Sequence, residues 1–304
     1  MERNLLQLDP NRAWDIAGRA EWFRMHEDKL KRARDYLTIL TESLPDLSLP
    51  VCDRMLLFGQ ATDNLGHLCK HWDALSEAEA LFGIAADMYA WLTTHMDSWE
   101  SQRYCTTRFL RLTKDRADMF RMELNLQKAA EMLKPLLNIA QGMHDEEVQS
   151  PHRFASAPRT RVAFAEILRS LGATCLDADQ PAAALRHLQK SQELLSDDSS
   201  VMSCEPNQLA EGLLKLSGVY LKQGSVDKAL TALDDAESHN RMERGVYAAR
   251  ISRSRALASL KDGSTEAVEQ ARKHCRDAST AAARLGLRLF QRRLATALAG
   301  NLLS

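Results

Sequence analysis

The clearest pattern of apolar and polar positions lies at residues 213–236, LLKLSGVYLKQGSVDKALTALDDA. Apolar residues recur three or four positions apart on both sides of Gly224, which predicts two amphipathic helices joined at that glycine. One face of the first helix carries Leu213, Leu216, Ser217 and Tyr220, and the second helix carries Ala229, Leu233 and Ala236. The small residues allow two antiparallel helices to approach closely, while the large ones fill the space beside them.

The same order of large and small residues recurs at 168–191 and 62–85, at 113–136, and more weakly at 17–40 and 247–275. An alanine opens the second helix of each pair: Ala33, Ala78, Ala129, Ala184, Ala229 and Ala267. This pattern resembles the tetratricopeptide repeat (TPR). The alanines lie 38 to 55 residues apart, more than the about 34 residues of the minimal repeat. Long-period arrays of this kind resemble those of kinesin light chains and kinesin-binding adaptors, to which QATDNLGHL (60–68) and AEALFGIAADMY (78–89) are faintly similar.

The resemblance implies an all-α fold, a right-handed α-solenoid of about six TPR-like helical hairpins with a C-terminal capping helix at 287–303. We expect one superhelix over residues 1–304, with sub-blocks 1–141 and 161–304 separated by a proline-containing polar loop at 142–160. Shorter loops are expected at 44–50 and 196–207. Long helices are expected at 51–72 and 98–122.

In TPR proteins the ligand meets the first helix of each hairpin, on the concave side of the superhelix. Carried onto this sequence, the resemblance implies a groove that binds a protein partner. Its residues are Gln60, Asp63, His67, Lys70 and His71 in one repeat, Arg108, Arg111, Lys114, Asp118 and Arg121 in the next, and Arg169, Lys215 and Lys222 further on.

Four of these residues, Arg108, Arg111, Lys114 and Arg121, form a basic stripe that Asp118 interrupts. Arginine binds carboxylates and phosphates in a bidentate manner, so the stripe predicts an acidic peptide or helix as the partner. The alternative is a solvated helix face whose cations pair locally with Asp115 and Asp118. The function predicted is that of a non-catalytic adaptor or scaffold subunit.

The sequence contains neither a nucleophile elbow nor a glycine-rich phosphate loop, so no enzymatic activity and no cofactor are expected. His67 and His71 lie one helical turn apart, a spacing that suits two zinc ligands. Because no third ligand accompanies them, we expect two polar residues on the groove side and no metal.

The net charge of −1 hides an asymmetry, since residues 241–304 hold 13 Lys/Arg and 5 Asp/Glu, a local net of +8. This supports an alternative function, a nucleic-acid-associated factor that uses region 241–304, with Arg284, Arg288 and Arg292 along one helix face. The apolar face of the terminal helix could also pair two copies into a homo-oligomer. It carries Leu287, Phe290, Leu294 and Leu298.

The sequence also bears on location. No apolar run approaches the ~18 residues of a membrane span, and the N-terminus lacks a secretory signal. The six cysteines are widely spaced and form no CxxC pair, which is typical of reduced thiols. We therefore expect a cytoplasmic or nuclear protein that does not bind membranes.

Overall fold

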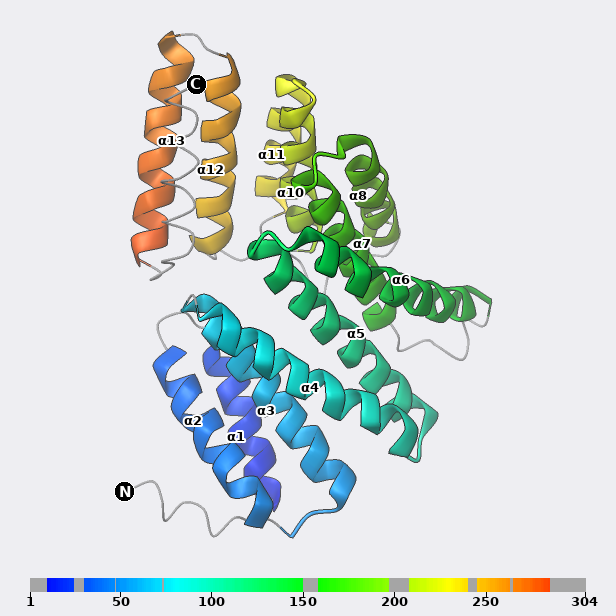
Figure 1. The fold of residues 1–304 in the computed structure, drawn as a ribbon. Helices are drawn as coiled ribbons and strands as arrows, with labels where there is room; N and C mark the ends of the chain where they lie inside the picture. The colour runs from blue at the N-terminus through cyan, green and yellow to red at the C-terminus, as the bar shows by residue number, and fades with distance from the viewer. Residues whose placement is uncertain are drawn as a thin grey trace. The chain divides into compact units, whose positions relative to one another are not determined.

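A computed structural model describes residues 10–24, 30–46, 48–72, 74–149, 158–196, 208–239, 245–262 and 265–284, which are α-helical apart from short turns and one 3₁₀ turn (Figure 1). The helices up to the middle of the chain are α1 (Pro10–Arg24), α2 (Leu30–Ser43), η3 (Leu44–Asp46), α3 (Val51–His71), α4 (Leu75–His95), α5 (Trp99–Met122) and α6 (Leu126–Gln149). They are followed by α7 (Pro158–Asp177), α8 (Pro181–Ser196), α10 (Gln208–Lys222), α11 (Val226–Ser238), α12 (Gly245–Asp262) and α13 (Thr265–Arg284). The long helices expected at 51–72 and 98–122 are thereby confirmed as α3 and α5.

The chain divides into two compact units, Met1–Glu123 and Leu124–Ser304. In the first unit, α1 pairs with α2 and α3 with α4, and α5 packs on α4. In the second, α6 packs on α7, and the pairs are α7 with α8, α10 with α11, and α12 with α13. The single superhelix over 1–304 and its sub-blocks 1–141 and 161–304 stay predictions.

The prediction of a loop at 142–160 was wrong at both of its bounds. Helix α6 continues to Gln149, and α7 begins at Pro158, where a proline suits the first turn of a helix. Gly142 and the acidic residues after it suggested a break, but Ala140 and Met143 are buried and keep α6 against its neighbour. Residues 150–157 and 197–207, and the expected capping helix at 287–303, lie outside the described residues.

The hairpins are held by close approach of their two helices at small residues. A Cβ atom added to Gly66 of α3 would lie 2.7 Å from Cε1 of Phe82 on α4. A Cβ atom added to Gly172 of α7 would lie 2.7 Å from Cγ of Leu188 and 3.2 Å from the carbonyl oxygen of Ala184 on α8. The residues that the sequence assigned to the second helices are buried as predicted. They are Ala33, Leu37, Ala78, Phe82, Ala129, Leu133, Ala184, Leu188, Ser191, Ala229, Leu233 and Ala236.

In the described part of the chain, three helix–helix turns contain a residue in the left-handed region, at φ values of 64° for Leu124, 58° for Asp179 and 74° for Gly224. After Gly224, the amide of Ser225 donates to the carbonyl of Tyr220 at 2.9 Å, and Gln180 donates to Cys175 in the same way at 2.8 Å. These bonds satisfy carbonyls at the end of the first helix. The sequence marked Gly224 as a turn, whereas Leu124, whose side chain is 79% exposed, gives no such signal.

Replacing Gly172 with alanine is expected to destabilise the second unit by about 1–3 kcal/mol, because the new methyl group meets both a side chain and a backbone carbonyl. Gly142→Ala is the matched control, since this helical glycine of the same unit has nothing within 4 Å of the added Cβ atom. The control is expected to stabilise the protein by about 0.5–1 kcal/mol. Urea denaturation of both variants measures the two effects, and equal stability of the two would contradict the close packing of α7 on α8.

Candidate binding face

Asp63, on α3, lies at the centre of the residues expected to bind a partner. Its carboxylate forms an ion pair with Arg108 of α5 and lies 3.3 Å from Nε2 of His67, one turn further along α3. Only 7% of its side chain is exposed. Burial alone would raise the pKa of Asp63, but Arg108 and His67 outweigh burial and lower the pKa to about 2. This carboxylate is therefore ionised at neutral pH and joins α3 to α5.

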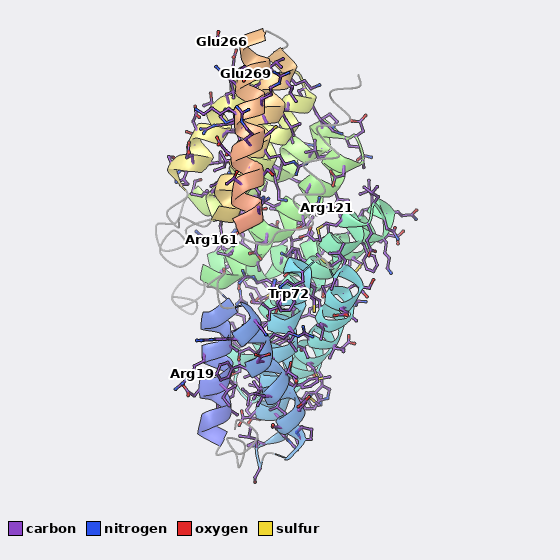
Figure 2. All side chains as sticks on the ribbon, turned by 90° about the vertical axis from the view of Figure 1, so that its left-hand side faces the viewer. Arg19, Trp72, Arg121, Arg161, Glu266 and Glu269 are labelled. Carbon is purple, nitrogen blue, oxygen red and sulfur yellow. The ribbon has the colours of Figure 1, made fainter. Side chains whose placement is uncertain are left out.

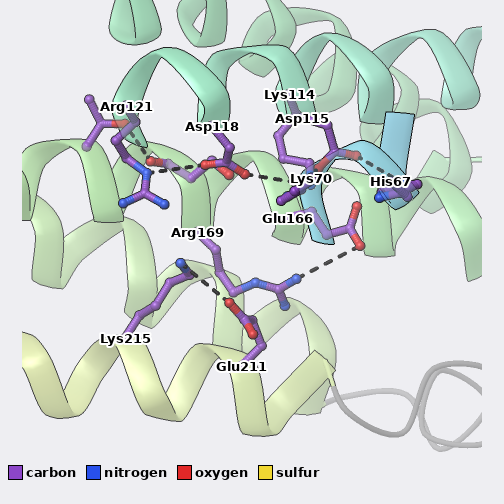
Figure 3. A network of polar contacts seen from close by, with 12 residues as sticks. His67, Lys70, Lys114, Asp115, Asp118, Arg121, Glu166, Arg169, Glu211 and Lys215 are labelled. Carbon is purple, nitrogen blue, oxygen red and sulfur yellow. Dashed lines mark hydrogen bonds and ion pairs between the residues drawn. The ribbon is translucent and has the colours of Figure 1, made fainter. Parts of the chain in front are cut away.

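A second buried carboxylate, Asp115 of α5, shares His67 with Asp63 and is labelled with Lys114, Lys70 and His67 in Figure 3. Its nearest partner is Nζ of Lys114 at 2.9 Å, followed by Nζ of Lys70 at 3.7 Å and Nε2 of His67 at 3.9 Å. Burial would raise its pKa, but Lys114, Lys70 and His67 hold the pKa far below its ordinary value. Asp115 thus gathers cations from both α3 and α5.

Asp118 continues this set along α5, 3.9 Å from Nζ of Lys114 and 3.3 Å from Nε of Arg121. The basic stripe therefore contains more acidic charge than the single interruption expected from the sequence. We call the following set the charged face of α3 and α5: Asp63, His67, Lys70, Arg108, Arg111, Lys114, Asp115, Asp118 and Arg121. Five cations and three carboxylates give it a formal charge of +2 with neutral histidine.

The charged face is anchored to the core of the first unit through Tyr89 of α4. The Arg108 guanidinium lies over the Tyr89 ring at 5.7 Å, a cation–π contact. Tyr89 is fully buried, and a Cβ atom on Gly59 of α3 would lie 3.1 Å from its Cε2. Burial raises the pKa of Tyr89 further above its ordinary value, so this phenol stays neutral. Arg108 is thereby held by an anion on one side and by a packed ring on the other.

The second unit holds a polar cluster on α7, α10 and α12, of which Figure 3 labels Glu166, Arg169, Glu211 and Lys215. Arg169 donates to the carbonyl oxygen of Gln208 at 2.9 Å, and Gln208 donates to Glu166 at 2.9 Å. Glu211 of α10 accepts from Arg250 of α12 at 2.9 Å and lies 3.5 Å from Lys215. Burial would raise the pKa of Glu211, but the neighbouring cations hold it well below its ordinary value. The sequence named Arg169 and Lys215 but missed Glu211 and Arg250.

The remaining predicted residues lie in different surroundings. Lys222, with 41% of its side chain exposed, donates to the carbonyl of Leu176 at 2.8 Å and pairs with Asp179 at 3.0 Å. It therefore bridges α10 to the turn between α7 and α8, away from the polar cluster. Gln60 is half-buried on α3 and its carbonyl accepts from Asn64 at 2.9 Å.

Other predicted residues reach the limits of the described chain. His71 ends α3 and Arg284 ends α13, but their side chains are not described. Arg288 and Arg292 lie beyond the described residues. On the described part of α13, Glu266 lies in the first turn, where the helix dipole favours a carboxylate, and Glu269 lies three residues further on (Figure 2). Arg272 lies 3.2 Å from Glu269. The described start of α13 thus presents both signs of charge, and the nucleic-acid alternative stays a prediction.

No protein-family model matches the chain, and no curated protein matches its sequence. Solved structures match its fold. A Rap protein complexed with competence and sporulation factor has a TM-score of 0.58 at 14% identity, over 91% of this chain and 72% of that one. BtubC (BKLC) from P. vanneervenii has a TM-score of 0.52 at 16% identity, over 78% of this chain and 85% of that one.

A third similar structure is a putative kinesin light chain with TPR-like repeats from Podosopora anserina, with a TM-score of 0.46 at 13% identity, over 78% of this chain and 99% of that one. The described helices and the structural similarity to the Rap protein confirm the predicted fold class, an all-α, TPR-like solenoid.

None of the helices in the described part of the chain combines the length and the apolar character needed to cross a membrane. Within the same residues, no three His, Cys, Asp or Glu side chains are grouped as metal ligands. His67 is instead occupied by two carboxylates of the charged face.

The lowered pKa of Asp63 predicts a pH dependence of stability. A carboxyl group with a pKa of about 2 in the folded state and 3.8 otherwise stabilises the fold at neutral pH by about 2 kcal/mol. This stabilisation is complete when the pH is above the pKa of the unfolded state. It is lost as the pH falls through the pKa of the folded state.

Asp63→Asn is expected to be a few kcal/mol less stable than wild type at pH 7, because Arg108 loses its anion. The difference from wild type should narrow as the pH falls from about 4 towards about 2. The control is Asp87→Asn, which alters an exposed carboxylate of α4 in the same unit. Denaturant titrations over this pH range test the account, and a difference that does not change with pH would contradict it.

Proposed function

We propose that this protein is a non-catalytic interaction module, an adaptor or scaffold subunit, and that the charged face of α3 and α5 binds its partner. The observation that carries the proposal is the arrangement of this face. Its side chains come from α3 and α5, which both pack on α4, and ion pairs to buried carboxylates fix several of them. The TPR-like fold supports a protein partner in general, and the Rap protein of similar fold is complexed with competence and sporulation factor.

The chemistry of the face favours an acidic segment of the partner. Its formal charge of +2 attracts carboxylates, and Arg111, Lys114 and Arg121 are spaced to lie along one side of α5. The cations already share three carboxylates, so an acidic ligand must compete with Asp118 for Lys114 and Arg121. Such competition favours a partner that brings several carboxylates or a phosphate at once.

The charged face is preorganised for binding. Asp63 and Asp115 hold their cations in place before any partner arrives, so less side-chain entropy is lost on binding. An enzymatic role would require a nucleophile or acid beside a reacting atom. The carboxylates of this face instead form ion pairs with neighbouring cations. A cytoplasmic or nuclear location and a homo-oligomer formed through the C-terminal helix stay predictions.

The test uses the full chain to capture partners from nuclease-treated lysate, with identification by mass spectrometry. The variant Arg111→Gln/Arg121→Gln removes two cations of the face. Lys114 is left unchanged, because buried Asp115 would lose its nearest cation. The control Lys128→Gln/Lys134→Gln removes two cations from exposed positions of α6.

The face variant is expected to lose a partner that carries an acidic segment, with affinity falling at least about tenfold. The α6 variant should keep that partner, and both variants should keep the helical circular-dichroism signal. An identical set of partners for both variants would contradict the proposal.

A further inference from the structure

Helix α4 has an apolar outer face in addition to the faces that it buries. It packs on α3 with one side and on α5 with another, through Phe82, Ala85, Tyr89 and Leu92. Its remaining side carries Ile84, Met88, Trp91 and His95, spaced four, three and four residues apart. Ile84 is 41% exposed, Met88 and Trp91 are half-buried, and His95 is exposed. An apolar side of a helix that its neighbours leave partly exposed is typical of a surface that a partner covers.

The spacing of this outer face is that of a coiled-coil seam. Residues that alternate three and four positions apart stay in line along a helix and receive the side chains of a partner helix between them. From Ile84 to His95 the seam is about 16 Å long, at a rise of about 1.5 Å per residue. A partner helix of about three turns is sufficient to cover it.

Trp91 is a preformed anchor within this seam. Its ring stacks on the His95 ring, with centroids 3.8 Å apart and planes 12° apart. Nδ1 of His95 lies 2.8 Å from the carbonyl oxygen of Trp91 and 2.9 Å from Oγ1 of Thr94, so the imidazole is held in place. A tryptophan that is already oriented loses little entropy on binding, and tryptophan is enriched among residues that dominate interface energies.

The charge around the seam is acidic. The sequence of α4 contains no lysine or arginine between Leu75 and His95. Exposed carboxylates lie at Glu77 near the start of the helix and at Asp87 beside the seam. Asp97 and Glu100, just beyond its end, are also exposed. Glu79 points elsewhere and pairs with Arg116 of α5 at 2.6 Å.

From these observations we propose that the outer face of α4 binds an amphipathic helix of a partner protein, with an apolar seam flanked by lysine and arginine. The apolar seam supplies burial, and the acidic rim selects a basic rather than an acidic helix. This surface is independent of the charged face of α3 and α5, which lies on other helices and carries the opposite net charge. One chain would then bind an acidic segment and a basic helix at two separate sites.

The test measures binding of the full chain to a synthetic fluorescent peptide helix with leucine at the seam positions and lysine around them, about three heptads long. An otherwise identical peptide with glutamate in place of lysine serves as the charge control. The seam variants are Ile84→Ser and Trp91→Ala. The matched control is Ile139→Ser, since Ile139 of α6 is 42% exposed and lies in the other unit.

Fluorescence anisotropy is expected to show binding of the basic peptide that each seam variant weakens at least about tenfold. Ile139→Ser should leave the affinity unchanged, and the acidic peptide should bind at least about tenfold more weakly. Equal affinity of the seam variants and wild type for the basic peptide would overturn the proposal.

Two further measurements distinguish other occupants of the seam. If wild type sediments as a dimer and Trp91→Ala as a monomer, a second copy of this chain covers the seam, and the proposed partner helix is wrong. If wild type binds phosphatidylcholine vesicles and the seam variants do not, the seam meets a lipid surface and the proposal is likewise overturned. If wild type is a monomer and does not bind the vesicles, the result supports the proposal. Loss of peptide binding in the seam variants does not bear on the charged face, whose variants are tested separately.

Discussion

The close approach of two helices at a small residue is the constraint on which the rest of this structure depends. Gly66 lies against the ring of Phe82, and Gly172 against Leu188 and the backbone of Ala184. Because each glycine lacks a side chain, the side chain of the second helix packs directly on the backbone of the first, which fixes the rotation of the first helix about its axis. That rotation decides which residues of α3 reach α5, and therefore where Asp63 lies relative to Arg108. The packing of α3 on α4 thus determines where the charged side chains of α3 lie relative to those of α5.

The buried ion pairs of the charged face contribute little net stability beyond that of an apolar pair, but they fix the positions of its charges. Taking Asp63 and Asp115 out of water is costly, and the neighbouring cations offset this cost only while each pair is intact. An apolar pair of equal volume would hold α3 to α5 as well, but it would not present a fixed pattern of charge. Such a pattern can distinguish partners by their charge, and the acidic rim of α4 would select the opposite kind of partner. The two surfaces therefore suit a protein that joins partners of unlike charge.

Much of this fold could be predicted from the sequence, because helix period and small-residue spacing are local properties. Ala184 and Ala229 were placed correctly in the second helices for this reason. The extension of α6 past Gly142 was not predicted, since Met143 and its buried surroundings outweigh the helix-breaking tendency of that glycine. The pairing of Asp63 with Arg108 spans 45 residues, and only the packing of α3 and α5 on α4 brings the two side chains together. Asp115 lies within the predicted stripe, but its role as the anion shared by Lys114 and Lys70 becomes visible only in three dimensions.

The central claim, that a partner binds on the charged face, is tested most directly by covalent capture. A photo-crosslinking amino acid is placed at position 111, in α5, and is activated by light in living cells. As a control, the same amino acid is placed at position 134 of α6 in a second variant of this protein. The account predicts a discrete adduct with another protein from position 111 and none from position 134. Adducts from position 134 alone, with position 111 unreactive, would contradict it.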